Sequence, residues 1–246
     1  MAIAAPSPSA ARGATFPSTR RLSRVAGALF LVTFVSAIAG AQLYSTALTD
    51  PRFAAGAGAD TGALVGAVCE LVLIAANIGT ALALFPVLRR RFPALSLGYV
   101  AARIVECGFI ALGIIAVLTL VSLHRSAGSD PSVATVAGAL VALHDWTFLL
   151  GPGFVVGLGN GLLLGVMMYR SRLVPRWMAL CGVIGGPLMT VSGIAVMFGA
   201  YPQLSPISAV LTLPEIVWEG SLGLWLLVKG FAPAGLAATA TETARP

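Results

Sequence analysis

Six long apolar stretches run through this chain, and they constrain its fold more than any other feature. They lie at about residues 25–44, 63–85, 97–121, 146–168, 177–199 and 207–231. A bilayer core is about 30 Å thick, so a spanning helix needs about 20 consecutive apolar residues, whereas a barrel strand needs only about 9–11. The sequence therefore predicts an all-α integral membrane helical bundle with six transmembrane helices and no soluble domain.

The composition excludes the common soluble classes. Hydrophobic residues make up 58% of the 246 residues and charged residues 10%, whereas soluble domains contain about 25% charged residues. The three cysteines, Cys69, Cys107 and Cys181, all fall within apolar stretches and form no CxxC pair, so we expect small apolar side chains rather than disulfides. A soluble enzyme, a disordered chain and a disulfide-stapled secreted domain are excluded.

The basic residues set the orientation of the bundle. Of the 15 Lys and Arg residues, Arg52 and Arg125 fall on one side of the predicted spans and Arg103 falls inside a span. The others share the opposite side: Arg12, Arg20, Arg21, Arg24, Arg89, Arg90, Arg91, Arg170, Arg172, Arg176, Lys229 and Arg245. The positive-inside rule then predicts a multi-pass protein of the plasma membrane with both termini cytoplasmic. The net charge of +6 reflects this bias, and we expect no nucleic-acid partner.

The segments outside the spans divide the chain further. Residues 22–231 form the predicted transmembrane domain, and residues 1–21 and 232–246, rich in Ala, Pro and Thr, are expected to be disordered cytoplasmic tails. Residues 131–153 are the least certain part. Their apolar stretch either lies in the interface, extends the fourth span outward or re-enters the membrane, and Gly151-Pro152-Gly153 is expected to bend or break the helix.

Glycines recur at every fourth position of the fourth span, at Gly153, Gly157, Gly161 and Gly165. Helices in lipid associate through small residues that let their backbones approach closely. This strip therefore predicts helix packing within the chain, and a seam between two copies is the alternative.

Seven strongly polar residues fall inside the predicted spans, and we name them the intramembrane polar cluster: Glu70, Asn77, Arg103, Glu106, Asn160, Glu215 and Glu219. A charge at mid-bilayer costs from about 2.5 to over 10 kcal/mol, so these side chains must face the bundle interior or a wet cavity. The spacing agrees, because residues three, four or seven apart share a helix face. We expect the seven residues to converge.

Four carboxylates and one guanidinium would leave an excess of three negative charges. A low-dielectric interior then requires protonated carboxyls, a bound cation or water. Arg103 is expected to pair with Glu106 on its own helix or with Glu219 across the bundle. Two interpretations remain open: a structural clamp, with Arg103 either paired or extended toward the cytoplasmic side, or a site for protons, a cation or a basic small molecule.

His144 and Asp145 precede Trp146 at the predicted outer mouth of the fourth span. Histidine beside a carboxylate can relay protons or bind metal, but neighbouring helical residues point about 100° apart. We expect an interfacial Trp anchor instead. Since no recognised catalytic or cofactor motif occurs in the sequence, we expect no metal, no cofactor and no enzymatic activity.

Several strings of this chain resemble the family called domain of unknown function 4386, uncharacterised multispanning and mainly bacterial membrane proteins. They are Ala76-Asn77-Ile78-Gly79-Thr80 after Glu70, Leu97-Gly98-Tyr99-Val100-Ala101-Ala102-Arg103 with Glu106, His144-Asp145-Trp146-Thr147-Phe148 to Gly153, and Trp218-Glu219 with Gly223 and Trp225. The resemblance covers roughly residues 20–232. It implies about six membrane helices and no particular activity.

These observations favour a small transporter-like or ligand-binding membrane protein, with Glu70, Glu106, Glu215 and Glu219 lining a site and Arg103 as their counter-ion. The alternative is a non-catalytic membrane scaffold or partner subunit whose cluster is only a clamp. The expected partners are the lipid bilayer, a small molecule, cation or proton, and a second copy of the chain in a homo-oligomer.

Overall fold

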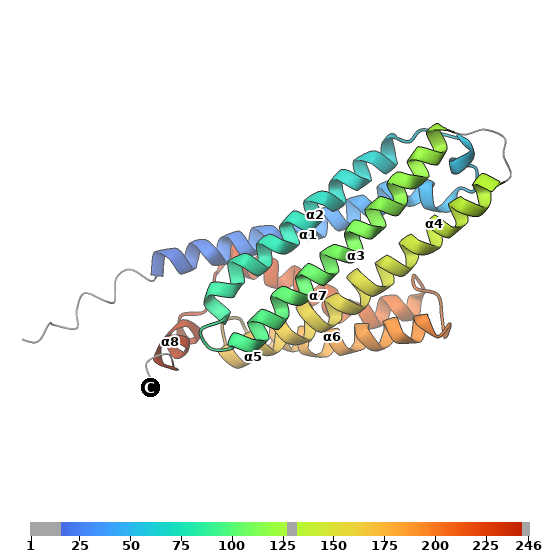
Figure 1. Cartoon of the computed structure of the whole chain (residues 1–246). Coiled ribbons are helices and arrows are strands. Elements are labelled where there is room, and N and C mark those ends of the chain that lie inside the picture. Colours follow the sequence, from blue (N-terminus) through green and yellow to red (C-terminus); the bar gives the residue numbers. More distant parts are fainter. Residues whose placement is uncertain (1–15, 127–131, 243–246) are drawn as a thin grey trace, which may run out of the picture.

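The computed structural model describes residues 16–126 and 132–242, which form helices and short turns without a strand in these two ranges (Figure 1). Six helical runs in the described residues are long and apolar enough to cross a membrane: Thr19–Thr49, Thr61–Leu88, Pro93–Arg125, Ser132–Ser171, Arg176–Met197 and Pro206–Val228. The predicted all-α bundle of six spans is confirmed, and the chain is a multi-pass membrane protein.

Local sequence explains where several helices begin. Proline at the first turn begins α3 and α7, because the missing N–H has no partner there in any helix. Ser205 also caps α7 by accepting a hydrogen bond from the Ser208 amide at 3.3 Å. The main spans and the short 3₁₀ turn after the first are α1 (Phe16–Thr49), η2 (Phe53–Ala55), α2 (Thr61–Leu88), α3 (Pro93–Arg125), α6 (Arg176–Met197) and α7 (Pro206–Val228).

The fourth span is one uninterrupted helical run that changes its winding. It passes through α4 (Ser132–Phe148), the π-helices η3 (Leu149–Val155) and η4 (Gly157–Leu164), and α5 (Gly165–Ser171). Of the expected alternatives, outward extension is therefore the one observed, and the expected break at Gly151-Pro152-Gly153 is wrong. These residues convert the helix from α to π, and Gly151 lets the π turn lie directly against Phe109 of α3.

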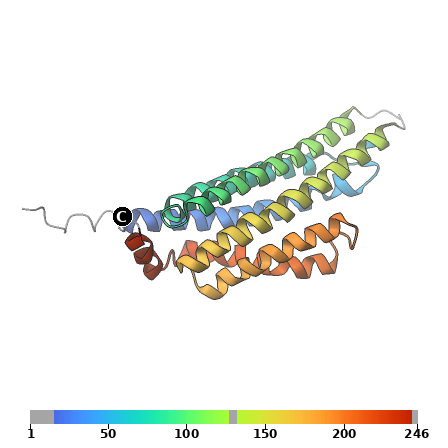
Figure 2. The ribbon, with the colours of Figure 1, turned by 60° about the horizontal axis from the view of Figure 1, so that its bottom comes forward.

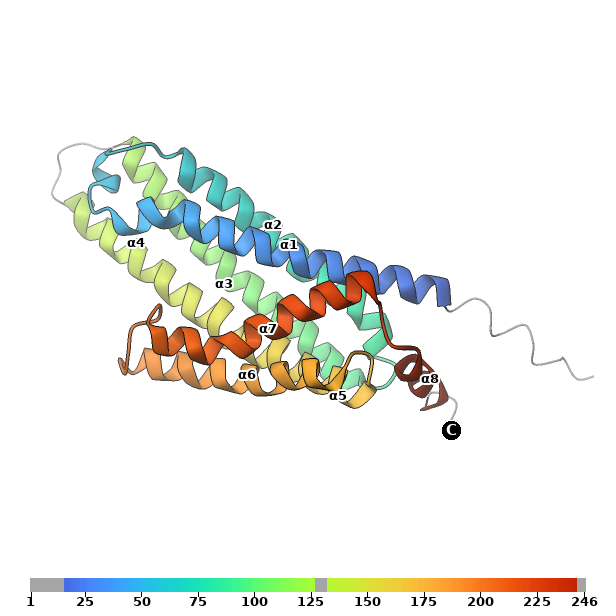
Figure 3. The ribbon, with the colours of Figure 1, turned by 180° about the vertical axis from the view of Figure 1, so that it is seen from behind.

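The helices of the bundle form three groups in a side view. Figure 2 shows α1, α2 and α3 grouped on one side, the fourth span in the middle and the α6–α7 pair on the other side. Seen from behind in Figure 3, α7 meets α1 near the C-terminal end of α7, and the two helices diverge toward the other end. This divergence leaves room between α1 and α7 for the cavity described below.

The glycine strip of the fourth span is used inside the chain. A β-carbon at Gly157, Gly161 or Gly165 would meet the backbone of α6 at Gly186 or at Gly182–Val183. Gly153, in contrast, would meet only its own helix. Three of the four glycines therefore lie directly against α6 of the same chain.

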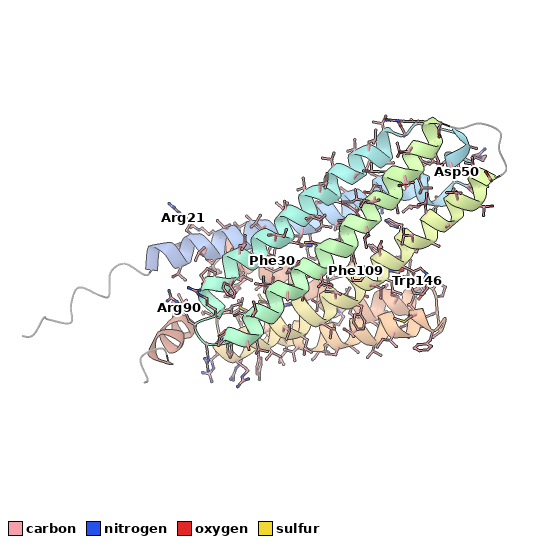
Figure 4. All side chains as sticks on the ribbon, in the orientation of Figure 1. Arg21, Phe30, Asp50, Arg90, Phe109 and Trp146 are labelled. Atoms are coloured by element: carbon pink, nitrogen blue, oxygen red, sulfur yellow. The ribbon has the colours of Figure 1, made fainter. Side chains whose placement is uncertain are left out.

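Two hydrophobic cores fill the ends of the bundle. One core gathers residues of all six spans, such as Phe30, Leu84 and Trp218, and the other gathers mainly α1, α2 and α3 around Tyr44 and Val117. Arg21 and Arg90 lie at the same end of the bundle as the first core, which we call the basic end, and Asp50 lies at the far end (Figure 4).

Polar contacts connect the α1–α2 loop to its neighbours at the far end of the bundle. Arg125 Nε lies 2.5 Å from Asp60 Oδ2, and the His124 ring nitrogen Nδ1 lies 2.8 Å from the Phe53 carbonyl oxygen. Hydrogen bonds from Arg52 lower the pKa of the Asp50 carboxyl. These contacts tie the α1–α2 loop to the end of α3.

The C-terminal segment differs from the expected disordered tail. Residues Pro233–Glu242 form the short helix α8, and the Ala232 amide donates a hydrogen bond of 2.8 Å to the Leu173 carbonyl. Leu236 packs against the core at the basic end, which gives this segment an apolar contact that its composition did not reveal. Residues 1–15 and 243–246 of the predicted tails lie outside the described residues.

Candidate functional site

Most of the intramembrane polar cluster lies between the two hydrophobic cores, whereas Glu70 lies between Ala67 and Leu73 of the core at the far end. Along α3, for example, Tyr99 belongs to the core at the basic end, Ile110 belongs to the far core, and Arg103 and Glu106 lie between them. Asn77 has the same position on α2, between Leu73 and Ala81. The structure thus brings the polar residues of several helices to one level of the bundle.

Arg103 is the centre of the cluster and is only 3% exposed. Its Nη1 donates to Glu106 Oε2 at 2.7 Å, and its Nε donates to the Tyr99 hydroxyl at 3.3 Å. The guanidinium also lies 5.7 Å from the centre of the Phe30 ring, within cation–π range. Arg103 therefore forms the expected pair with Glu106 and does not extend away from the cluster.

Glu106 is satisfied on both oxygens. Its Oε2 accepts from Arg103, and its Oε1 accepts from Asn77 Nδ2 at 2.8 Å. The three side chains come from α2 and α3 and are each at most 4% exposed. A buried ion pair whose carboxylate accepts a hydrogen bond on each oxygen connects these two helices.

Asn160 joins the fourth span to α7. Its Nδ2 donates to Glu219 Oε1, and its backbone carbonyl accepts from Trp218 Nε1 at 2.9 Å. The Tyr99 hydroxyl lies 3.5 Å from Asn160 Oδ1. A continuous chain of polar contacts therefore leads from Glu106 through Arg103, Tyr99 and Asn160 to Glu219.

Glu215 stands apart from this chain of contacts. The side chain is 2% exposed, and neither carboxyl oxygen has a hydrogen-bond partner among the described residues. Glycines make room for it: a β-carbon at Gly161 would meet its Oε2, and one at Gly185 would meet its backbone. The fold thus buries a carboxyl group that has neither a hydrogen bond nor an ion pair among the described residues.

Glu70 occupies the α2 side of the cluster and is half-buried. Its Cγ packs against the backbone position of Gly40 on α1. The neighbouring Tyr44 ring covers Gly66, and the buried Tyr44 hydroxyl has no hydrogen-bond partner within 3.5 Å among the described residues. The Tyr44 hydroxyl is therefore a second buried polar group without a hydrogen-bond partner among the described residues.

A cavity of about 350 Å³ connects these groups, and we call it the central cavity. All four glutamates of the cluster border it, together with Asn77 and Arg103, while Asn160 lies behind its wall and touches Glu219. The remaining wall residues are Thr33, Phe34, Ala37, Ile38, Ala41, Leu73, Phe148, Pro152, Val156, Met189, Thr212 and Ile216. The cavity is a mainly apolar chamber with carboxyl groups on several of its walls.

His144 and Asp145 do not form a shared site. His144 is buried beside Tyr44 of α1, with ring centres 5.7 Å apart, while the Asp145 side chain is 66% exposed. Their closest polar atoms are 3.8 Å apart. The helix that carries both residues begins at Ser132, about three turns before them. Within the described residues, no group of three potential metal-binding side chains occurs.

Sequence reasoning missed three residues of the site. Tyr99 bonds Arg103, Trp218 bonds the Asn160 backbone, and Tyr44 lies beside Glu70. Tyr99 was detectable in principle, because it lies four residues before Arg103 and so shares its helix face. No local signal indicated Tyr44, whose contact with α2 depends on how α1 packs.

Comparison with known proteins gives one match. A family model described as "Domain of unknown function (DUF4386)" matches residues 25–230. No curated protein and no solved structure matches the chain. The matched region contains every residue of the intramembrane polar cluster.

Proposed function

The chain belongs to the DUF4386 family of domains of unknown function, and from this premise we propose that it is a membrane transporter or ligand-binding protein for a positively charged small molecule, an inorganic cation or a proton. Glu70, Glu106, Glu215 and Glu219 line the site, and Arg103 is their counter-ion. The observation that carries this proposal is the buried, unpartnered carboxyl group of Glu215 on a cavity bordered by three further glutamates.

The distribution of charge supports binding over a purely structural role. Glu106 forms an ion pair with Arg103 at 2.7 Å. Among the described residues, no basic side chain other than Arg103 borders the cavity, so the three other glutamates have no basic partner of their own there. A clamp requires only the Arg103–Glu106–Asn77 contacts. The additional acidic groups are costly inside a membrane, and a cation or proton in the cavity offsets that cost.

The alternative is a scaffold or partner subunit. The hydrogen-bonded Arg103–Glu106–Asn77 group favours it, since these contacts connect α2 to α3. A scaffold predicts that cluster substitutions change stability or partner recovery and leave every flux unaltered.

Proton movement in proteoliposomes tests the proposal. Vesicles with pyranine inside receive an external acid step, with and without added rubidium or methylammonium ions. Wild type is expected to change the internal pH faster than empty vesicles in at least one of these conditions, and Glu215→Gln, Glu219→Gln and Glu106→Gln are expected to abolish the difference. Asp145→Asn, which alters an exposed carboxyl of the fourth span, is the matched control.

The same preparation separates the two functions. If correctly folded cluster variants behave like wild type in all three conditions, transport is excluded. Labelling with dicyclohexylcarbodiimide, an apolar reagent that modifies protonated carboxyls, provides a direct readout of the site. Glu215 is expected to be labelled and Asp145 to remain unlabelled.

We also propose an orientation of the helical bundle in the membrane. The basic end carries Arg21 and Arg90 (Figure 4), and the positive-inside rule places that end in the cytoplasm. We expect both termini on the cytoplasmic side of the plasma membrane. Reporter domains fused after Pro246 and inserted after Gly58 should report opposite sides.

A further inference from the structure

We propose that the central cavity takes a hydrophobic organic cation with a single positive charge, such as a tertiary or quaternary amine. This inference rests on the proposed function, because it names the ligand class of the same site. The juxtaposition of one unpaired buried carboxyl group with aromatic and aliphatic walls carries it.

The carboxyl group supplies the recognition of charge. Glu215 is 2% exposed, borders the central cavity and has no hydrogen-bond partner on either oxygen among the described residues. Arg103 forms no hydrogen bond with Glu215, and its Nη1 and Nε donate to Glu106 and Tyr99 instead. A cationic ligand beside Glu215 would provide the direct ion pair that this carboxyl group lacks among the described residues.

The apolar side chains of the cavity wall favour a ligand with apolar substituents. Phe34 and Phe148 border the cavity together with Leu73, Met189 and Val156. Aromatic faces attract an alkylated ammonium group and aliphatic side chains cover its carbon substituents. A small inorganic cation instead requires a shell of oxygen ligands, whereas most of these side chains present carbon.

The size of the cavity and a route to it fit the same ligand class. The volume of about 350 Å³ lies within the range of small-molecule sites, about 300–1,000 Å³. A second cavity of about 400 Å³, which we call the side cavity, adjoins it and extends along α7 to Gln203 and Ser205. Both cavities share Phe148, Pro152, Met189, Thr212 and Ile216.

The route has a suitable length. Glu215 lies ten residues from Ser205, or about 15 Å along α7 at about 1.5 Å per residue. Helices α6 and α7, of 22 and 23 residues, match the thickness of a bilayer core of about 30 Å. The side cavity therefore leads from one membrane surface to Glu215 near mid-membrane.

Equilibrium binding tests the inference. Wild-type protein in phosphatidylcholine nanodiscs receives radiolabelled benzyltrimethylammonium, with empty nanodiscs subtracted. Competition with unlabelled neopentylbenzene, its neutral isostere, and with potassium ions separates charge from shape. We expect saturable binding of benzyltrimethylammonium, with both competitors at least about tenfold weaker, a difference of about 1.4 kcal/mol. Glu215→Gln should weaken binding at least about tenfold, and Asp145→Asn should not.

Other outcomes overturn the inference in distinguishable ways. If neopentylbenzene competes as well as the labelled cation, the cavity is an apolar pocket for lipid chains and the inference is wrong. If benzyltrimethylammonium does not bind while a Glu215-dependent proton or rubidium flux persists, the proposed function stands and the inference fails. If no probe depends on Glu215, both fail. Should Glu215→Gln not fold, the three-ligand comparison on wild type still decides.

Discussion

The carboxyl oxygen Oε2 of Glu215 lies 2.5 Å from the position that a β-carbon would take at Gly161. The two residues belong to α7 and to the π-helical part of the fourth span. The missing side chain of Gly161 thus creates the space in which the unpaired carboxyl group lies. Gly161 therefore belongs both to the glycine strip that packs against α6 and to the surroundings of the Glu215 carboxyl group.

Gly161→Ala should destabilise the protein. The added methyl group would meet both Glu215 Oε2 and the Gly186 Cα, each at 2.5 Å, and overpacking of this kind costs about 1–3 kcal/mol. The midpoint of thermal unfolding in detergent should fall. Gly138→Ala is the control, because a β-carbon there meets nothing within 4 Å. Equal midpoints for the two variants would contradict the packing described above.

Removing the partner of Arg103 should cost more than removing any surface charge. Glu106→Ala leaves a buried guanidinium unpaired, for which about 3–5 kcal/mol is expected. Arg125→Ala breaks the exposed pair with Asp60 and should cost at most about 1 kcal/mol. Unfolding midpoints provide the measurement. The double variant Arg103→Met with Glu106→Met should recover part of the loss, and its failure to do so would argue against a simple ion pair.

The sequence was sufficient for the spans and for the membership of the cluster. Apolar length identifies membrane helices without any tertiary information, and the cost of a buried charge requires Glu70, Arg103, Glu106, Glu215 and Glu219 to avoid lipid. Local spacing also predicted the pair of Arg103 with Glu106, three residues apart on one helix.

The different roles of the glutamates were not predictable from the sequence. Glu215 and Glu219 lie one turn apart and look equivalent, yet Glu219 accepts from Asn160 and Glu215 has no such partner. That difference depends on how α7 packs against the fourth span. The π-helical winding around Pro152 was also not predicted, because local rules indicate only a bend or a break at Gly-Pro-Gly, whereas the structure has a continuous run with π-helices there.

Thr212 should be reachable from water. It borders both the central and the side cavity. With Cys69, Cys107 and Cys181 replaced by Ala, Thr212→Cys should react with a membrane-impermeant, positively charged thiol reagent added at the far end. Val217→Cys places the thiol on the half-exposed lipid side of the same helix and should react much more slowly. Equal rates would mean that the side cavity is not a water-accessible route.

A bulky residue in the side cavity should slow ligand exchange. Ala209 borders that cavity, whereas its neighbour Val210 is 68% exposed on the outer surface of α7. Ala209→Trp should reduce the association and dissociation rates of benzyltrimethylammonium several-fold and leave its equilibrium affinity nearly unchanged. Val210→Trp should behave like wild type. Unaltered rates for Ala209→Trp would place the route elsewhere.

The contact between Gly27 and Gly223 has a mechanical consequence. A β-carbon at Gly27 would meet the backbone of α7, so the two helices touch there, and beyond this point they separate. Such a contact acts as a fulcrum, and displacement grows with distance from a fulcrum. Along α7, Glu215 lies about 12 Å from Gly223 and Ser205 about 27 Å. A rigid rotation of α7 about this contact would therefore move Ser205, at the opening of the side cavity, more than twice as far as the Glu215 carboxyl group.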